Sequence, residues 1–179
     1  CFARKISEVG LRVQGQPREY LKVQEPLWVE GSVLKQGQPS KATLIVLPSD
    51  RLEVSFTFSS DHQATGTQFL HYTLDAPTFT REIAPARTIA FVEEIEYLRS
   101  QGLALSDAYD CAVIVGANGY QNELHFPDEI VRHKILDILG DLYLVGPLLG
   151  HLVAVRSGHA LDLELARLIS ARSIQPALS

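Results

Sequence analysis

The 179-residue sequence contains no methionine and only two cysteines, Cys1 and Cys111. A chain that lacks methionine and begins with cysteine is expected to be a fragment or a processed product of a longer protein. Two cysteines are too few for a disulfide framework, and they favour a reducing compartment. They also cannot form a thiolate zinc cage, so any metal would have to be bound by histidine and carboxylate side chains.

Other absences exclude whole classes of protein. No apolar run reaches the roughly 18 residues that a membrane-spanning helix requires, and the N-terminus shows no signal-peptide pattern. The net charge of −5 provides no broad basic surface for nucleic acid. Apolar residues make up 46% and charged residues 21% of the chain, which is typical of soluble globular proteins.

The first half of the chain predicts a short helix followed by antiparallel strands. Residues 1–10 have the apolar spacing of a helix end, and the breaker at residues 14–17 places a domain boundary near residue 17. Residues 52–58 alternate between apolar and polar side chains, as a half-buried antiparallel strand does. Further strands are expected at residues 18–24, 27–35, 42–47 and 67–74.

The second half introduces helices. Phe91, Ile95 and Leu98 recur at helical spacing, and residues 111–115 form a short apolar strand. We expect a helix from Pro127 to about Val145, and then a strand and a last helix at residues 148–155 and 157–172. The pattern predicts an α+β fold: a two-layer sandwich of a mainly antiparallel sheet with helices on one face, plus a small inserted β-α-β unit at about residues 91–115.

Three polar residues share one face of the helix that follows Pro127. At about 100° per residue, His133, Asp137 and Asp141 form a stripe separate from the apolar residues of the same helix. An ordinary solvated face is one interpretation of this stripe. The other is a metal site, because a histidine and an aspartate four residues apart can chelate one ion. His159 lies at a strand-to-helix turn, where it is either a surface histidine or a functional group.

Larger sequence blocks carry more information than these spacings. The chain contains ARTIAFVEEIEYLRSQGLAL, then DCAVIV, then FPDEIVRHKILDILGDLYLVG, and about a dozen residues later SGHAL. These ordered blocks resemble the UDP-3-O-acyl-N-acetylglucosamine deacetylases (the LpxC family). The likeness covers roughly residues 18–172, and residues 1–11 resemble the last helix of that family's first domain. The implied division is residues 1–17 as the end of a first domain with a linker, and residues 18–179 as the second domain.

The resemblance implies a zinc-dependent enzyme that removes the N-acetyl group from a UDP-linked, 3-O-acylated glucosamine, the committed step of lipid A synthesis in Gram-negative bacteria. His133 and Asp137 match two of the three zinc ligands of the family. His159 matches the histidine near the scissile amide, and Asp141 matches the carboxylate that pairs with it. Thr88 matches a threonine that hydrogen-bonds the oxyanion.

Further matches concern the substrate. Lys134 corresponds to a basic residue on the substrate's polar side, and the unit at about residues 91–115 corresponds to a passage for the fatty acyl chain. Phe91 and Tyr109 are the residues of this unit that we expect to contact substrate. Two departures lie there: residues 105–108 read LSDA where the family has a glycine-rich turn, and Ile89 replaces an aromatic residue.

The family's third zinc histidine and its general-base glutamate belong to a first-domain motif that this sequence does not contain. The chain is therefore expected to need the N-terminal domain of the same protein as a partner, and to be a monomer when complete. We expect a cytoplasmic protein, at or near the inner-membrane surface. The alternatives are an inactive fragment, or a module that binds the acyl chain or nucleotide sugar without chemistry.

Overall fold

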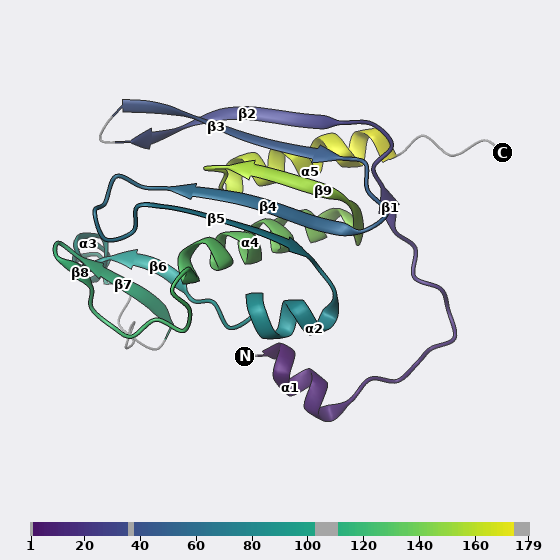
Figure 1. Cartoon of the computed structure of the whole chain (residues 1–179), viewed down its shortest axis with the longest axis horizontal. Helices are drawn as coiled ribbons and strands as arrows, with labels where there is room; N and C mark the ends of the chain where they lie inside the picture. Colours follow the sequence, from purple (N-terminus) through teal and green to yellow (C-terminus); the bar gives the residue numbers. More distant parts are fainter. Residues whose placement is uncertain (1, 36–37, 103–110, 174–179) are drawn as a thin grey trace.

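A computed structural model describes residues 2–35, 38–102 and 111–173, and it confirms the α+β fold class (Figure 1). The main sheet has the strand order β2-β3-β9-β4-β5, and the short strand β1 pairs in parallel with β9. The β2–β3, β3–β9 and β4–β5 pairs are antiparallel, whereas β4 and β9 run parallel. The strands are β1 (Leu21–Lys22), β2 (Leu27–Lys35), β3 (Gln38–Leu47), β4 (Leu52–Ser59), β5 (Thr67–Thr73) and β9 (Leu148–Val155).

Alternation along the strands separates a buried face from an exposed one. Val54 and Phe56 of β4, and Leu152 and Ala154 of β9, are at most 1% exposed. Helices α4 (Glu129–Leu142) and α5 (His159–Ser173) cover this face and lie behind the sheet in Figure 1. The apolar stripe of α4 enters the same core, through Val131, Ile135, Ile138 and Leu142. The polar stripe of α4 is thereby held on a rigid, two-layered support.

The expected inserted unit is a second, three-stranded sheet. Strand β6 (Thr88–Phe91) leads into α3 (Val92–Ser100), and β7 (Ala112–Gly116) returns parallel to β6 before the short β8 (Gly119–Tyr120). Every residue of β7 is buried, as its continuous apolar sequence predicts. Figure 1 shows this unit at one end of the main sheet, beside the start of α4.

The sequence did not predict the helical segment before β6. Helix α2 (Ala76–Thr78) continues into the π-helix η1 (Phe79–Ile83). Its start is capped by Asp75, whose side chain accepts a hydrogen bond of 2.7 Å from the backbone N–H of Thr78. Pro77 in the first turn is compatible with this start.

The N-terminal helix α1 (Phe2–Val9) lies apart from the sheet and is joined to β1 by an extended segment (Figure 1). Its apolar side chains are exposed, with Phe2 at 90% and Val9 at 89%. The segment first meets the main body at Arg18, whose guanidinium contacts the rings of Tyr20 and Tyr143. The domain boundary near residue 17 remains a prediction that this arrangement accommodates.

Candidate active site

His133 and Asp137 lie side by side on α4, as their four-residue spacing requires. His133 Nε2 is 3.2 Å from Asp137 Oδ1. His133 Nδ1 lies 3.2 Å from the carbonyl oxygen of Ala86, which can only accept a hydrogen bond, so Nδ1 carries the ring proton. The other ring nitrogen, Nε2, faces the Asp137 carboxylate. This is the arrangement of a metal-binding histidine whose other nitrogen is held by a backbone carbonyl.

Lys134 contributes a positive charge to the same pair. Its Nζ is 2.7 Å from Asp137 Oδ2, so the two oxygens of Asp137 face different neighbours. Burial acts to raise the pKa of Asp137, but the hydrogen bonds from His133 and Lys134 outweigh it and lower that pKa to about 2. The Asp137 side chain is therefore an anion at neutral pH although it is only 14% exposed.

One turn further along α4, Asp141 meets the first residue of α5. His159 Nδ1 and Asp141 Oδ2 are 2.6 Å apart. The hydrogen bond to Asp141 raises the pKa of His159, and the partial burial of the ring only opposes it. The negative charges of Asp141 and Asp137 act in the same direction as the bond, while Lys134 opposes them. Asp141 thus favours the protonated form of His159, whose side chain is 65% exposed.

Asp162 is a member of this group that the sequence analysis missed. It is 1% exposed and accepts a hydrogen bond of 2.8 Å from Ser157 Oγ. Asp141, His159 and Asp162 each have a ligand atom within 4.8 Å of the others. Burial raises the pKa of Asp162, while the Ser157 bond opposes the shift. Its place three residues after His159, in the first turn of a helix, was the signal that could have pointed to it.

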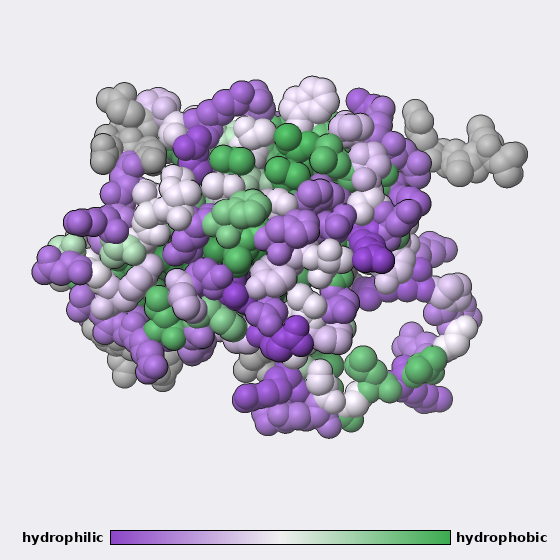
Figure 2. Space-filling view, viewed as in Figure 1, coloured by the Kyte–Doolittle hydropathy of each residue, from purple (hydrophilic) through white to green (hydrophobic). Residues whose placement is uncertain are grey.

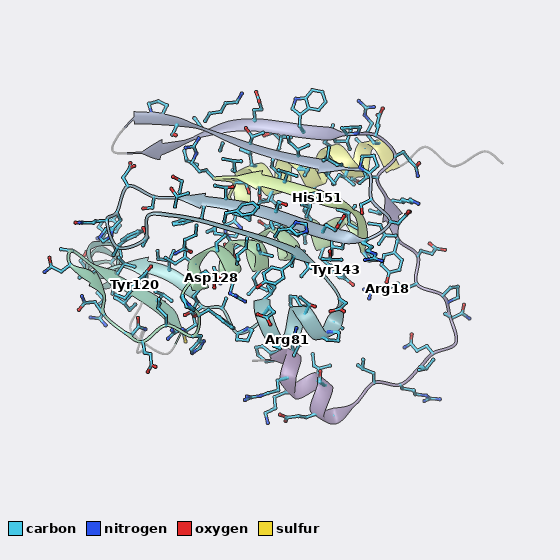
Figure 3. All side chains as sticks on the ribbon, in the orientation of Figure 1. Arg18, Arg81, Tyr120, Asp128, Tyr143 and His151 are labelled. Atoms are coloured by element: carbon cyan, nitrogen blue, oxygen red, sulfur yellow. The ribbon has the colours of Figure 1, made fainter. Side chains whose placement is uncertain are left out.

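A buried ion pair fixes the chain just before Thr88. Glu129 is fully buried at the start of α4, where its carboxylate lies 2.9 Å from Arg87 Nε and accepts the backbone N–H groups of Arg87 and His125 at 2.9 and 2.7 Å. Asp128 and Tyr143, labelled in Figure 3, mark the two ends of α4. Thr88 follows Arg87 directly and is exposed, two residues beyond the Ala86 carbonyl that holds His133.

The expected substrate contacts in the insert are Phe91 and Tyr109. Phe91 ends β6 and lies against the ring of His62, with the ring centroids 5.5 Å apart. Tyr97 of α3 is 66% exposed, so it does not line an enclosed passage here. Tyr109 lies outside the described residues. The structure therefore brings together His133, Lys134, Asp137, Asp141 and His159, and Thr88 lies two residues beyond the Ala86 carbonyl that contacts His133.

Comparison with known proteins identifies relatives of this chain. Residues 1–171 match a family model described as UDP-3-O-acyl N-acetylglycosamine deacetylase. The chain is 38% identical over 170 residues to the UDP-3-O-acyl-N-acetylglucosamine deacetylase of Leptospira biflexa, which is 94% of this chain and 54% of that protein. It is 40% identical over 167 residues to the protein of the same name from Citrifermentans bemidjiense, covering 92% and 52% respectively.

The chain spans about half the length of these relatives. Among the residues that the structure describes, no helix combines the length and the apolar character needed to cross a bilayer.

Proposed function

Because the chain belongs to the UDP-3-O-acyl N-acetylglycosamine deacetylase family, we propose that it supplies one half of the active site of such an enzyme. The proposed reaction is the zinc-dependent hydrolysis of the N-acetyl group of UDP-3-O-acyl-N-acetylglucosamine, the committed step of lipid A biosynthesis. The observation that carries this proposal is a double pairing along one face of α4. His133 pairs with Asp137, and Asp141, one turn further along, pairs with His159 of α5. A merely solvated face does not require either pairing.

His133 and Asp137 fit a zinc ion. His133 offers Nε2 as a ligand while the Ala86 carbonyl holds Nδ1, and Asp137 offers an ionised oxygen. Bound there, zinc would polarise the acetyl carbonyl and lower the pKa of a bound water. Two protein ligands are one short of a catalytic zinc site, and the family resemblance assigns the third histidine and the general-base glutamate to a first domain. That domain is the partner we propose for this chain.

Three residues of this chain take the other roles in the proposed reaction. His159, held protonated by Asp141, donates a proton to the leaving amine, because a neutral amine leaves more readily than an anionic one. The Thr88 hydroxyl donates a hydrogen bond to the oxygen that becomes negative in the transition state. Lys134 is placed to attract the polar part of the substrate, and its contact with Asp137 keeps that charge beside the reacting groups.

Metal removal tests the proposed function. In a protein that joins this chain to the first domain, we expect chelation to abolish acetate release from UDP-3-O-acyl-N-acetylglucosamine. One equivalent of zinc should restore it. The measurement is the rate of acetate release together with the zinc content of each sample. Unchanged turnover in metal-free protein would contradict the zinc site, and an inability to release acetate under any metal condition would favour the binding-module alternative.

The pH dependence should report the partner of His159. Asp141 raises the pKa of His159, so the protonated donor persists to higher pH than a free imidazole would, and activity should fall as the pH rises through that pKa. Asp141→Asn removes the negative charge and should move this alkaline limb to lower pH. The profile of kcat/KM against pH measures the shift, with the exposed Asp61→Asn as the matched control. An alkaline limb that stays in place would show that another group sets it.

A further inference from the structure

Two histidine side chains point toward each other on the face of the main sheet that is opposite α4 and α5. His71 lies on β5, which pairs with one side of β4, and His151 lies on β9, which pairs with the other side. Between them β4 presents Ser55, a small residue that pairs in register with His71. His151 pairs in register with Glu53, the preceding residue of β4 on the same face, and it is labelled in Figure 3.

Both imidazoles point a ring nitrogen at the same atom. His71 Nδ1 and His151 Nε2 each lie 2.9 Å from Ser55 Oγ. The ring centroids are 5.4 Å apart, and the planes are nearly perpendicular at 79°. The three side chains come from three adjacent strands of a sheet with a buried opposite face, so their backbones are held in fixed register. The convergence of the two nitrogens is therefore a property of the fold.

The tautomers open to these two rings allow both nitrogens to act as ligands of a cation. A serine hydroxyl has one proton to donate and two lone pairs, so it can donate to one ring and accept an N–H from the other. At least one of the two nitrogens can thus carry a lone pair toward Ser55. A change of tautomer in the other ring moves its proton to the far nitrogen, so both lone pairs can face one point without any loss of charge.

A carboxylate lies next to His151 in the register of the sheet. Glu53 Oε2 accepts a hydrogen bond of 2.8 Å from Ser49, and Oε1 lies 3.4 Å from the Thr73 hydroxyl. The Ser49 bond lowers the pKa of Glu53, and partial burial opposes this. Glu53 is therefore an anion on the same face of β4 as Ser55. Two imidazoles with a nearby carboxylate match the ligand preference of Zn²⁺, Cu²⁺ and Ni²⁺ rather than that of Mg²⁺ or Ca²⁺.

We propose that His71 and His151 bind a divalent transition-metal ion above Ser55, with water completing the coordination. This site lies on the face of the sheet opposite α4, where the catalytic residues are proposed to lie. The ion takes the place of the Ser55 hydroxyl between the two nitrogens, and the exposed His71 side chain has the freedom to close on it. The proposal stands whether or not the chain is part of a deacetylase.

Paramagnetic Ni²⁺, added alone to the 179-residue chain at pH 7.5, tests the site residue by residue. Amide resonances of β4, β5 and β9 near Ser55 should broaden in a saturable way in ¹H–¹⁵N spectra. His71→Gln and His151→Gln should each weaken this binding by at least about tenfold, since even the loss of an outer-shell partner of a metal site costs 10–100-fold. Broadening near His133 should be the same in both variants and serves as the internal reference.

His125→Gln is the matched control, because His125 is also exposed and its Nδ1 contacts a backbone carbonyl, that of Pro85. It should bind Ni²⁺ above Ser55 as the unchanged chain does. The proposal is overturned if the β4 resonances do not broaden at all. It is equally overturned if either glutamine variant, with the dispersed spectrum of a folded protein, keeps the affinity of the unchanged chain.

Discussion

His159→Ala should lower turnover by on the order of a hundredfold or more in the enzyme that we propose, because it removes the proposed proton donor. It should leave the zinc content unchanged, since His159 faces Asp141 and does not share the His133–Asp137 pair. His133→Ala is expected to differ in kind, because it removes a proposed zinc ligand next to Asp137, so the metal and the activity should be lost together. Zinc stoichiometry and kcat for the two variants measure the contrast.

His62→Ala is the control for this pair, because His62 packs on Phe91 rather than in the polar stripe of α4. It should retain both zinc and most of the turnover. If His159→Ala loses zinc as His133→Ala does, then His159 is a ligand and the roles assigned here are wrong.

Glu129→Gln should destabilise the chain by about 3–5 kcal/mol, the usual cost of removing one partner of a buried ion pair. Glu129 is 0% exposed, and the Arg87 side chain that faces it is 11% exposed. Water therefore cannot solvate the Arg87 guanidinium in place of the lost carboxylate charge. The free energy of unfolding from urea denaturation measures the loss. Glu164→Gln, an exposed position on α5, is the matched control and should stay within about 0.5 kcal/mol of the unchanged chain.

The same pair predicts the direction of the pH dependence of stability. Burial acts to raise the pKa of Glu129, but the hydrogen bonds of Arg87 and His125 outweigh it, so the folded-state pKa lies below the ordinary glutamate value of 4.5. The stabilisation is therefore present above that value and is lost as the pH falls through the folded-state pKa. A Glu129→Gln chain should lose less stability than the unchanged chain over this acid range. An equal loss in both chains would place the acid sensitivity elsewhere.

The sequence predicted best those features that depend on local periodicity. The apolar stripe of α4, with Ile135 and Ile138, follows from a spacing of 3.6 residues, and the same spacing places His133 next to Asp137. The alternation in β4 correctly assigned Val54 and Phe56 to the buried face. These patterns need only neighbours in the chain, because a helix or a strand repeats the same geometry wherever it packs.

Contacts between distant segments could not be obtained in this way. Arg87 and Glu129 are 42 residues apart, and neither lies in a pattern that demands a partner. The pairing of Asp141 with His159 was expected only from the family resemblance. Asp162 was missed because an acidic residue in the first turn of a helix is ordinary, and only tertiary packing shows that it is buried beside His159.

The position of β9 sets the order in which the chain can fold during synthesis. The β2–β3 and β4–β5 hairpins are complete by residue 73, but they share no backbone hydrogen bonds until β9 lies between β3 and β4. Strand β9 begins at Leu148, so a nascent chain carries two unjoined hairpins with open edges while residues 74–147 are added. The main sheet can form as one unit only after residue 155 has left the ribosome. The late pairing of β9, its central strand, is therefore the folding step most exposed to edge-to-edge aggregation.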